Sequence, residues 1–402
     1  MYHFSATQFR KQFPAINSQT IHLDSAATAL KPNSMIEAAD NYYRHSGSSV
    51  YRGQSPESLR ITENYEQGRK RVAKLINAES ENTIIWTRGT TESINLIAQS
   101  YFRNHLTAND EIIVSELEHH SNLLPWLILA QQTGAKIVKW PVTQHYTLDI
   151  ESLKPLLNPR SKVIAITQMS NVTGYQTNLA AVTSLAHAAG ALVVVDGAQG
   201  VVHAPIDVTA LNIDFYAFSA HKLYGPTGLG VCYGKPQLLA AMSPWHGGGK
   251  MLSEVNFEGF TPASVPYCFE AGTPNIAGVI AFSATLDWLS HIDLHQSEAY
   301  CCSLIHYAYE ELSKLEGFIC YSQPNTPLLS FNFAGIHHSD LGLLLTEQKI
   351  ALRYGQHCTQ PLMDAIAITG CLRISVMPYN DQQDIDKFIN AVKFALSILN
   401  DE

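Results

Sequence analysis

The stretch DFYAFSAHKLYGPTG, residues 214–228, joins an apolar run to a lysine and then to a tight turn. Residues 214–218 have the composition of a buried strand, and Lys222 follows shortly after its end. The Gly-Pro-Thr-Gly at 225–228 predicts an abrupt turn, so no regular element continues that could carry the lysine out to water. A desolvated lysine loses its proton more readily and becomes a nucleophilic amine. The same residues also fit a lysine whose charged end reaches solvent from a strand end.

A second apolar run decides between these interpretations. Residues 192–199 read LVVVDGAQ, which predicts a strand covered on both faces that ends in Asp196. In open α/β sheets ligands bind beyond the carboxyl ends of the strands, so Asp196 and Lys222 can converge on one ligand from neighbouring strands. Pyridoxal phosphate needs this pair, because a lysine holds its aldehyde as a Schiff base and a carboxylate keeps its pyridine nitrogen protonated.

Length and composition favour a sizeable enzyme of a reducing compartment. The 402 residues correspond to roughly two or three domains, and a hydrophobic content of 46% can fill more than one core. A formal net charge of −9, without a run of lysine or arginine, argues against nucleic acid or an anionic membrane as the main partner. Neither a secretory signal nor a membrane span is expected. The seven cysteines form no Cys-x-x-Cys pair, which favours free thiols and a cytoplasmic location.

Strand-like and helical segments alternate along the chain, which predicts βαβ units, a mainly parallel sheet and the α/β fold class. Two helices are expected first, at residues 33–45 and 56–76, because apolar residues recur there at helical spacing. Five of the expected strands lie at residues 83–87, 112–114, 136–138, 163–166 and 193–195.

The pattern changes near residue 277, where long helices give way to short strands separated by helices. The last helix, residues 381–399, has one apolar face that is expected to dock it. We therefore expect two domains: a large one made of residues 19–289, and a smaller α/β domain made of residues 1–18 and 290–402.

The phosphate of the expected cofactor needs backbone N–H donors. Gly89, Thr90 and Thr91 lie where a strand is expected to lead into a helix, and the N-terminus of that helix offers such donors. Ser219 and His221 flank the lysine and can add more donors, although a structural role fits either residue as well.

The segment EHHSN, residues 118–122, follows another strand end and therefore faces the same crevice. A histidine in it can lie over the pyridine ring and move protons. Metal binding is the alternative, with His337 and His338 as a second pair. Adjacent residues diverge on regular elements, and no His-Glu-x-x-His or Cys-x-x-Cys motif accompanies them, so no metal is expected.

Residues 353–361, RYGQHCTQP, form a polar loop that contains Cys358. The cysteine lies beside His357 and five residues after Arg353, and cationic neighbours lower the pKa of a thiol and make it reactive. The other six cysteines have the apolar or helical surroundings of core residues. Arg373 follows in a strand-like run of apolar residues, where a guanidinium needs a bidentate anion, and a substrate carboxylate fits this need.

These motifs resemble the cysteine desulfurases of the class V aminotransferase family, in particular the Suf/Csd-type group also called cysteine sulfinate desulfinases or selenocysteine lyases. The resemblance runs nearly end to end, and the Csd-like branch is the most similar. The motifs that carry it are LDSAAT (23–28), RGTTE (88–92), EHHSN (118–122), MSNVTG (169–174), VDGAQ (195–199), the His221-Lys222 stretch, EAGTPN (270–275) and the loop at 353–361 with its GQHC.

The resemblance implies a fold type I pyridoxal-phosphate-dependent transferase with a mainly parallel seven-stranded sheet in its large domain. It implies a homodimer that binds pyridoxal 5'-phosphate and converts L-cysteine to L-alanine. The sulfur then passes to an acceptor protein of the Suf/Csd E type, for iron–sulfur clusters or other sulfur cofactors. A lyase that acts mainly on L-selenocysteine or L-cysteine sulfinate is the alternative.

The resemblance also implies roles for matching residues around the cofactor ring. Lys222 is the Schiff-base lysine, Asp196 contacts the pyridine nitrogen, Gln199 contacts the ring hydroxyl and His119 lies over the ring. The phosphate-binding set is Thr90, Thr91, Ser219, His221 and, from the partner subunit of the homodimer, Thr273.

On the substrate side, the resemblance implies that Asn171, Arg373 and Arg353 bind the amino acid. Cys358, on the loop of the small domain, takes its sulfur as a persulfide. The chain departs from its relatives at Tyr51, where histidine is common, and at Tyr354, where a small residue is common. Both departures bear on substrate preference and acceptor docking.

Overall fold

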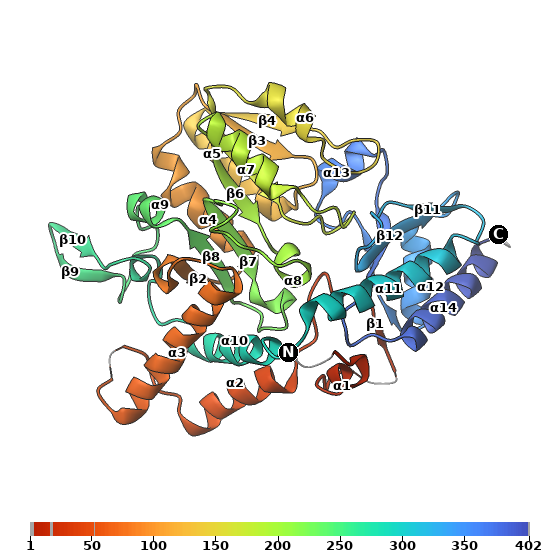
Figure 1. Ribbon diagram of the computed structural model, residues 1–402, viewed down its shortest axis with the longest axis horizontal. Coiled ribbons are helices and arrows are strands. Elements are labelled where there is room, and N and C mark those ends of the chain that lie inside the picture. The colour runs from red at the N-terminus through yellow and green to blue at the C-terminus, as the bar shows by residue number, and fades with distance from the viewer. Residues whose placement is uncertain (1–3, 17–18, 52, 401–402) are drawn as a thin grey trace.

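The structure is a computed structural model that describes residues 4–16, 19–51 and 53–400. Its two main β-sheets have seven and four strands (Figure 1). The seven-stranded sheet lies among the orange, yellow and green elements, and the four-stranded sheet lies among the blue ones at the other end of the molecule. The α/β class and the seven-stranded sheet are confirmed.

The seven-stranded sheet is mainly parallel, as predicted. Four neighbouring pairs are parallel, and only the two pairs that include β8 are antiparallel. In spatial order the strands are β2 (Ile84–Thr87), β8 (Gly230–Gly234), β7 (Phe215–Ser219), β6 (Leu192–Asp196), β5 (Ser161–Thr167), β3 (Glu111–Ser115) and β4 (Lys136–Trp140).

Both faces of this sheet are buried, which explains its continuous apolar runs. On β6, Val193 and Val195 belong to one hydrophobic core and Val194 belongs to the core on the opposite face. All three side chains are fully buried. A strand between two cores needs apolar residues at every position, so the run in 192–195 predicted its place correctly.

Helices pack around this sheet. The long helices α2 (Asn33–His45) and α3 (Pro56–Leu75) pack against α10 (Ile276–Leu289). Helix α3 begins where Ser55 accepts a hydrogen bond from the backbone N–H of Ser58 and Pro56 takes the first turn. The other helices here are α4 (Thr90–Ser100), α5 (Leu124–Thr133), α6 (Ile150–Leu153), α7 (Leu179–Ala188), α8 (Gly200–His203) and α9 (Pro236–Ala241).

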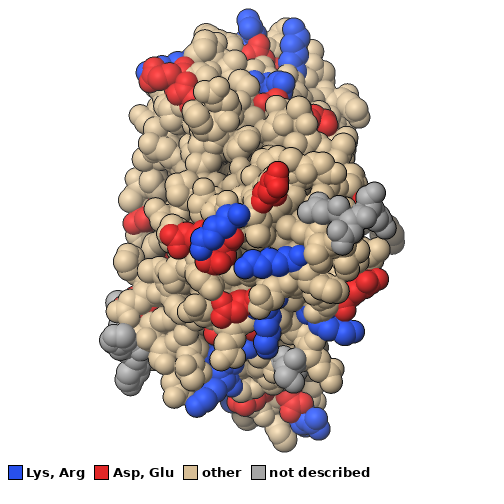
Figure 2. Space-filling view, turned by 90° about the vertical axis from the view of Figure 1, so that its right-hand side faces the viewer, with Lys and Arg blue, Asp and Glu red and all other residues tan. Residues whose placement is uncertain are grey.

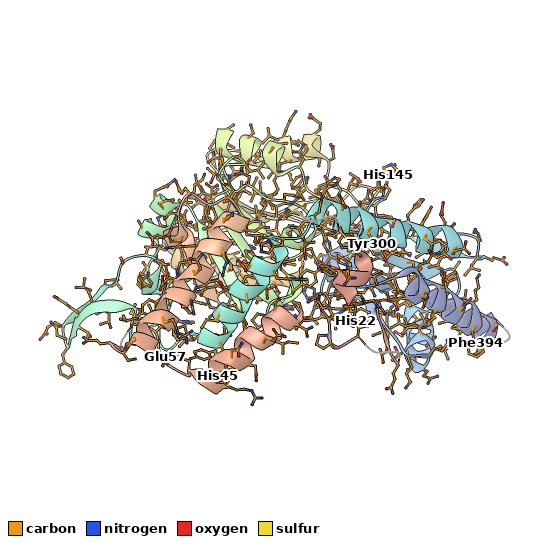
Figure 3. The ribbon with its side chains drawn as sticks, turned by 60° about the horizontal axis from the view of Figure 1, so that its bottom comes forward. His22, His45, Glu57, His145, Tyr300 and Phe394 are labelled. Carbon is orange, nitrogen blue, oxygen red and sulfur yellow. The ribbon has the colours of Figure 1, made fainter. Side chains whose placement is uncertain are left out.

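The four-stranded sheet is antiparallel and carries a third hydrophobic core. Its strands, in spatial order, are β11 (Phe318–Cys320), β12 (Leu328–Phe333), β15 (Cys371–Ser375) and β14 (Arg353–Gly355). Around it are α11 (Leu294–Leu312), α12 (His338–Glu347), α13 (Gln360–Ala365) and α14 (Gln382–Asn400). The predicted apolar face of α14 is confirmed, because Ile385, Phe388 and Val392 are fully buried. Phe394 lies on its exposed side (Figure 3).

The N-terminal segment crosses to the side of the smaller sheet. After α1 (Ala6–Arg10), the short strand β1 (Ile21–His22) pairs in parallel with β13 (Ile350–Ala351). Leu23 joins the third core. The predicted division into residues 19–289 and residues 1–18 with 290–402 remains a proposal, and residues 1–3, 17, 18, 401 and 402 of the smaller part lie outside the described residues.

A hairpin made of β9 (Leu252–Asn256) and β10 (Gly259–Pro262) projects from the larger half of the molecule (Figure 1). Its apolar side chains Val255, Phe257 and Phe260 are exposed. An exposed apolar cluster of this kind marks a contact surface.

The face at the end of the smaller sheet carries lysine and arginine interspersed with aspartate and glutamate (Figure 2). No helix in the described ranges is long and apolar enough to cross a membrane.

Candidate active site

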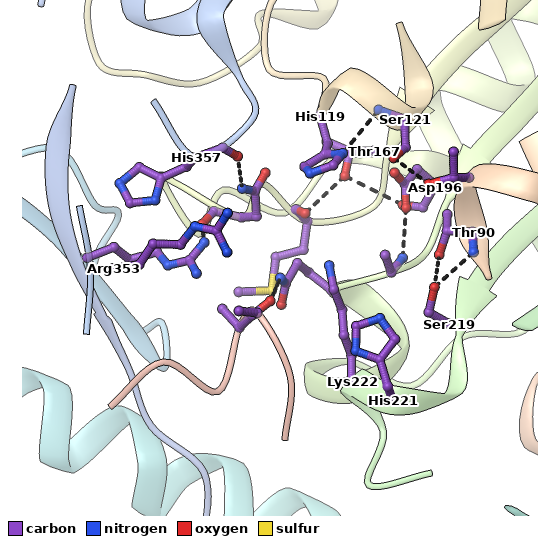
Figure 4. A pocket seen from close by; sticks show the side chains of 18 residues that line it. Thr90, His119, Ser121, Thr167, Asp196, Ser219, His221, Lys222, Arg353 and His357 are labelled. Atoms are coloured by element: carbon purple, nitrogen blue, oxygen red, sulfur yellow. Dashed lines mark hydrogen bonds between the residues drawn. The ribbon is translucent and has the colours of Figure 1, made fainter. Parts of the chain in front are cut away.

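A cavity of about 210 Å³ lies where β5, β6 and β7 end (Figure 4). Segments from both halves of the chain line it, because Arg353 and Arg373 reach it from the four-stranded sheet. The structure brings together eleven of the side chains predicted from the sequence: Thr90, Thr91, His119, Asn171, Asp196, Gln199, Ser219, His221, Lys222, Arg353 and Arg373.

Lys222 and Asp196 reach the cavity from neighbouring parallel strands. Asp196 ends β6 and pairs with Ala217 of β7, and Lys222 ends the 3-10 turn that follows β7. Burial lowers the pKa of Lys222 to about 8, although the nearby Asp196 carboxylate acts in the opposite direction. Burial also raises the pKa of Asp196. The lysine is therefore desolvated, as the first interpretation of residues 214–228 expected.

Hydroxyl groups gather where α4 begins. The Thr90 backbone N–H donates to Ser219 Oγ over 2.8 Å, and the Thr90 and Ser219 hydroxyls are 2.7 Å apart. Thr91 Oγ1 lies 2.7 Å from the hydroxyl of Ser121, a residue that sequence reasoning did not single out. Donors around the positive end of a helix dipole form a site that suits an anion.

His221 lies beside this cluster as a neutral imidazole. Burial, followed by the charges of Lys222 and Lys31, lowers its pKa to about 4. Its Nδ1 atom is buried without a hydrogen-bond partner among the described residues. A buried polar atom without a partner costs free energy, so this nitrogen is available to a ligand.

His119 lines the cavity and is also neutral. Burial lowers its pKa to about 3, and the charge of Lys222 adds to the effect. The backbone N–H of Ser121 donates to His119 Nδ1 over 3.1 Å, which assigns the imidazole proton to Nε2. His119 therefore offers a donor N–H rather than a positive charge.

Glu118, next to His119, is a buried carboxyl group that sequence reasoning missed. It accepts hydrogen bonds from the Ser115 hydroxyl at 2.5 Å, the Asn122 amide at 2.6 Å and the Thr167 backbone at 3.0 Å. Burial raises its pKa to about 8. Its position in the EHHSN motif gave a signal, but the motif could not tell which of its residues would be buried.

Arg373 is fully buried and already holds two partners. Its Nη1 donates to the Asn171 backbone carbonyl over 2.9 Å, and its Nη2 donates to Asp24 Oδ1 over 2.8 Å. Its Nε atom is buried without a partner in the described part of the chain. Arg353 lies opposite Arg373 across β14 and β15, so two guanidinium groups come to one end of the cavity. Asp24 was not predicted, although it lies in the LDSAAT motif.

Two predicted residues do not line the cavity: Cys358 and Thr273. Cys358 is partly buried and close enough to affect the pKa of Lys222. Thr273 is exposed. His357 does line the cavity, and burial lowers its pKa well below the ordinary value. His357 is therefore neutral, and the expectation that it would be a cationic neighbour of Cys358 is wrong.

All seven cysteines are free thiols. Within the described residues, no group of three or more His, Cys, Asp or Glu side chains has the arrangement of a metal site. Of the adjacent histidines His119 and His120, only His119 lines the cavity.

An α/β fold with a half-buried lysine and a buried carboxylate at neighbouring strand ends is typical of pyridoxal-phosphate-dependent enzymes. The chain belongs to the aminotransferase class-V family, whose model it matches over residues 21–388. It is 54% identical over 398 residues to "Cysteine desulfurase CsdA" of Escherichia coli (strain K12), covering 99% of each chain. It is 46% identical over 396 residues to "Probable cysteine desulfurase" of Vibrio cholerae serotype O1, covering 97% of this chain and 98% of the relative.

Two solved structures are also similar. The crystal structure of the E. coli cysteine desulfurase CsdA, in an S-sulfonic acid form, has a TM-score of 0.95 and covers 99% of this chain and 100% of that chain. The apo structure of cysteine desulfurase from Thermococcus onnurineus NA1 is 32% identical, with a TM-score of 0.94, and covers 99% of this chain and all of that one.

Proposed function

We propose that this protein is a pyridoxal-phosphate-dependent cysteine desulfurase. It converts L-cysteine to L-alanine and holds the sulfur as a persulfide on Cys358. The observation that carries the proposal is the pair of Lys222 and Asp196. Asp196 is buried and Lys222 is half-buried at neighbouring strand ends in one cavity, and the pKa of Lys222 is lowered to about 8.

The residues present fit the cofactor. The hydroxyl and N–H groups of Thr90, Thr91 and Ser219, together with the unpartnered Nδ1 of His221, suit its phosphate. Asp196 would hold the pyridine nitrogen, and Lys222 would hold the aldehyde. Gln199 would contact the ring hydroxyl, His119 would lie over the ring, and Thr273 would come from the partner subunit. When bound, pyridoxal phosphate supplies an electron sink for the bonds at the substrate Cα.

Lys222 performs the proton transfer in this proposal. A pKa of about 8 leaves a useful fraction of its amine neutral near physiological pH, so Nζ can take a proton from Cα and return it. The Asp196 carboxylate is fixed by the backbone N–H of Ala198, which donates to it over 2.8 Å. Asp196 is thus held in place before the cofactor or the substrate arrives.

Arg373, Arg353 and Asn171 would bind the substrate. The partnerless Nε of Arg373 is a buried donor, and a carboxylate in the cavity would satisfy it. Asn171 is fixed because its side-chain amide donates to the His357 carbonyl over 3.1 Å. A substrate bound in this way would lie beside the loop of Cys358, which Asn171 contacts through the His357 carbonyl.

Sulfur transfer then requires only the groups named so far. The Cys358 thiol and the substrate sulfur form an S–S bond while the substrate Cβ–S bond breaks. Cβ gains a hydrogen and becomes the methyl group of alanine, and Cys358 becomes a persulfide. The overall exchange of one cysteine and one thiol for one alanine and one persulfide is balanced without another oxidant or reductant.

Lys222→Ala should abolish turnover of L-cysteine, because both the cofactor anchor and the proton carrier are lost. The measurement is alanine release, with visible absorbance of the purified protein as a second readout. Lys154→Ala, which removes an exposed lysine paired with Glu151, is the matched control. Alanine release by Lys222→Ala at a rate near that of the wild type would overturn the proposal.

A second function, a lyase acting mainly on L-selenocysteine or L-cysteine sulfinate, is favoured by one observation: Cys358 does not line the cavity. Sulfinate and selenium leave Cβ with less nucleophilic help than the sulfur of cysteine. Cys358→Ala should therefore lose activity on cysteine and keep much of its activity on cysteine sulfinate. Equal losses on both substrates would exclude the second function.

The proposal includes a homodimer and a sulfur-acceptor protein of the Suf/Csd E type, in a cytoplasmic pathway for iron–sulfur clusters or other sulfur cofactors. The exposed apolar hairpin supports the dimer, and exposed Tyr354 and Leu343 beside the Cys358 loop support acceptor docking. The free cysteines support a reducing compartment.

A further inference from the structure

The loop of Cys358 has an unusual backbone. His357 and Cys358 are consecutive residues with φ of +52° and +58°, the left-handed region that residues with a Cβ avoid. Such a conformation persists only where its surroundings hold it. The partners of this loop therefore decide where the Cys358 thiol lies.

One residue from the opposite side of the site makes two hydrogen bonds to the loop, both on the C-terminal side of the Cys358 side chain. The backbone N–H of His120 donates to the Cys358 carbonyl over 2.7 Å. On the other side, the backbone N–H of Gln360 donates to His120 Nε2 over 3.2 Å. These two bonds bracket Thr359, so His120 spans the short connection between the left-handed pair and α13. The bond to Nε2 assigns the imidazole proton of His120 to Nδ1.

Other contacts also hold the loop, but none of them does what the bonds to His120 do. Asn171 donates to the His357 carbonyl, and His357 Nε2 lies 2.9 Å from the Cys371 carbonyl. Both contacts lie before Cys358 in the chain. After Cys358, Thr359 bonds back to Gln356 within the loop itself. Among the described residues, the two hydrogen bonds to His120 tie this second side of the loop to the opposite half of the molecule.

We infer that His120 is a positioning residue for Cys358: it holds the strained loop so that the thiol is presented to the substrate sulfur. The inference deepens the proposed function and rests on it. Adjacent histidines of the EHHSN segment then divide two tasks. His119 lines the cavity, and His120 holds the thiol loop.

The test compares the holoenzyme with His120→Ala, His120→Gln and a control, His145→Ala. A glutamine oxygen can accept the Gln360 N–H in place of Nε2, so His120→Gln should recover much of the effect. His145 is an exposed histidine of another loop (Figure 3), and its loss should change nothing. Three quantities are measured: hydrogen exchange at the Gln360 amide, the alkylation rate of Cys358 by iodoacetamide, and kcat and KM for L-cysteine and L-cysteine sulfinate.

In His120→Ala we expect faster exchange at Gln360 and a changed alkylation rate of Cys358. We expect kcat for L-cysteine to fall roughly 10- to 100-fold with little change in KM, because a small displacement of a reacting group costs this much. Turnover of cysteine sulfinate should fall far less. A general folding defect would reduce both substrates alike and would count against the inference.

The inference is overturned if His120→Ala leaves both the alkylation rate of Cys358 and kcat for L-cysteine near those of His145→Ala. Failure of the proposed function gives a different result, because the wild type itself would then release no alanine from cysteine. The exchange and alkylation measurements would still report on the loop in that case.

Discussion

The burial of Arg373 favours the binding of an anionic ligand. Desolvation lowers its pKa, and the negative charge of Asp24 offsets part of that cost. A buried charge with one unsatisfied donor is destabilising, and a carboxylate that accepts a hydrogen bond from Nε would satisfy that donor. This end of the cavity therefore suits an anion that accepts a hydrogen bond from Nε.

Arg373→Lys should raise KM for L-cysteine by roughly tenfold or more, because one compact ammonium cannot replace three separate donors that face Asn171, Asp24 and the cavity. Steady-state kinetics on cysteine and cysteine sulfinate measure this, and both substrates should respond. Arg160→Lys, an exposed arginine paired with Glu111, is the matched control. An unchanged KM would move the carboxylate site to another residue, with Arg353 the next to test.

Residues at strand ends were predictable because the fold itself brings them together. Asp196 and Lys222 follow apolar runs that could only be buried strands, and parallel strands deliver their carboxyl ends to one edge. Partners brought in by tertiary packing were not predictable. Asp24 is 349 residues from Arg373, and the neutrality of His357 depends on a burial that its polar loop does not reveal.

At the scale of elements, the parallel part of the large sheet followed from the apolar runs, whereas the direction of β8 did not. Its sequence, GVCYG, fits a buried strand of either direction. The turn at 225–228 is short, and a short connection allows only an antiparallel return. The hairpin of β9 and β10 was also not predicted. Its strands lie on the surface and bury no residue, so they lack the apolar pattern of a core.

The hairpin gives a prediction about assembly. Phe257→Asp should shift the proposed dimer towards monomer, because burying a new unpaired charge in an apolar contact is costly. Size-exclusion chromatography with light scattering over a range of protein concentrations measures the shift. Phe394→Asp is the matched control, since Phe394 is also an exposed phenylalanine but lies on α14 (Figure 3). If both variants shift equally towards monomer, or neither does, the hairpin is not part of the dimer interface.

At the scale of the whole molecule, the site lies between the two sheets and depends on segments far apart in sequence. The chain near residue 24 contacts both halves: Asp24 pairs with Arg373, and the Ala26 carbonyl accepts a hydrogen bond from Gln199 over 2.7 Å. From the opposite half, His120 holds the loop of Cys358. These contacts hold the cavity at the end of the larger sheet and the loop of Cys358 beside each other.

The most direct test of this account is to find where the sulfur goes. The wild-type holoenzyme is exposed briefly to L-cysteine, digested without reductant and analysed by mass spectrometry. We expect one added sulfur atom on the peptide that contains Cys358, lost on treatment with a thiol reductant and absent from Cys358→Ala. Alanine release with the added sulfur on Cys302, Cys320 or another thiol, or with no protein persulfide at all, would contradict it.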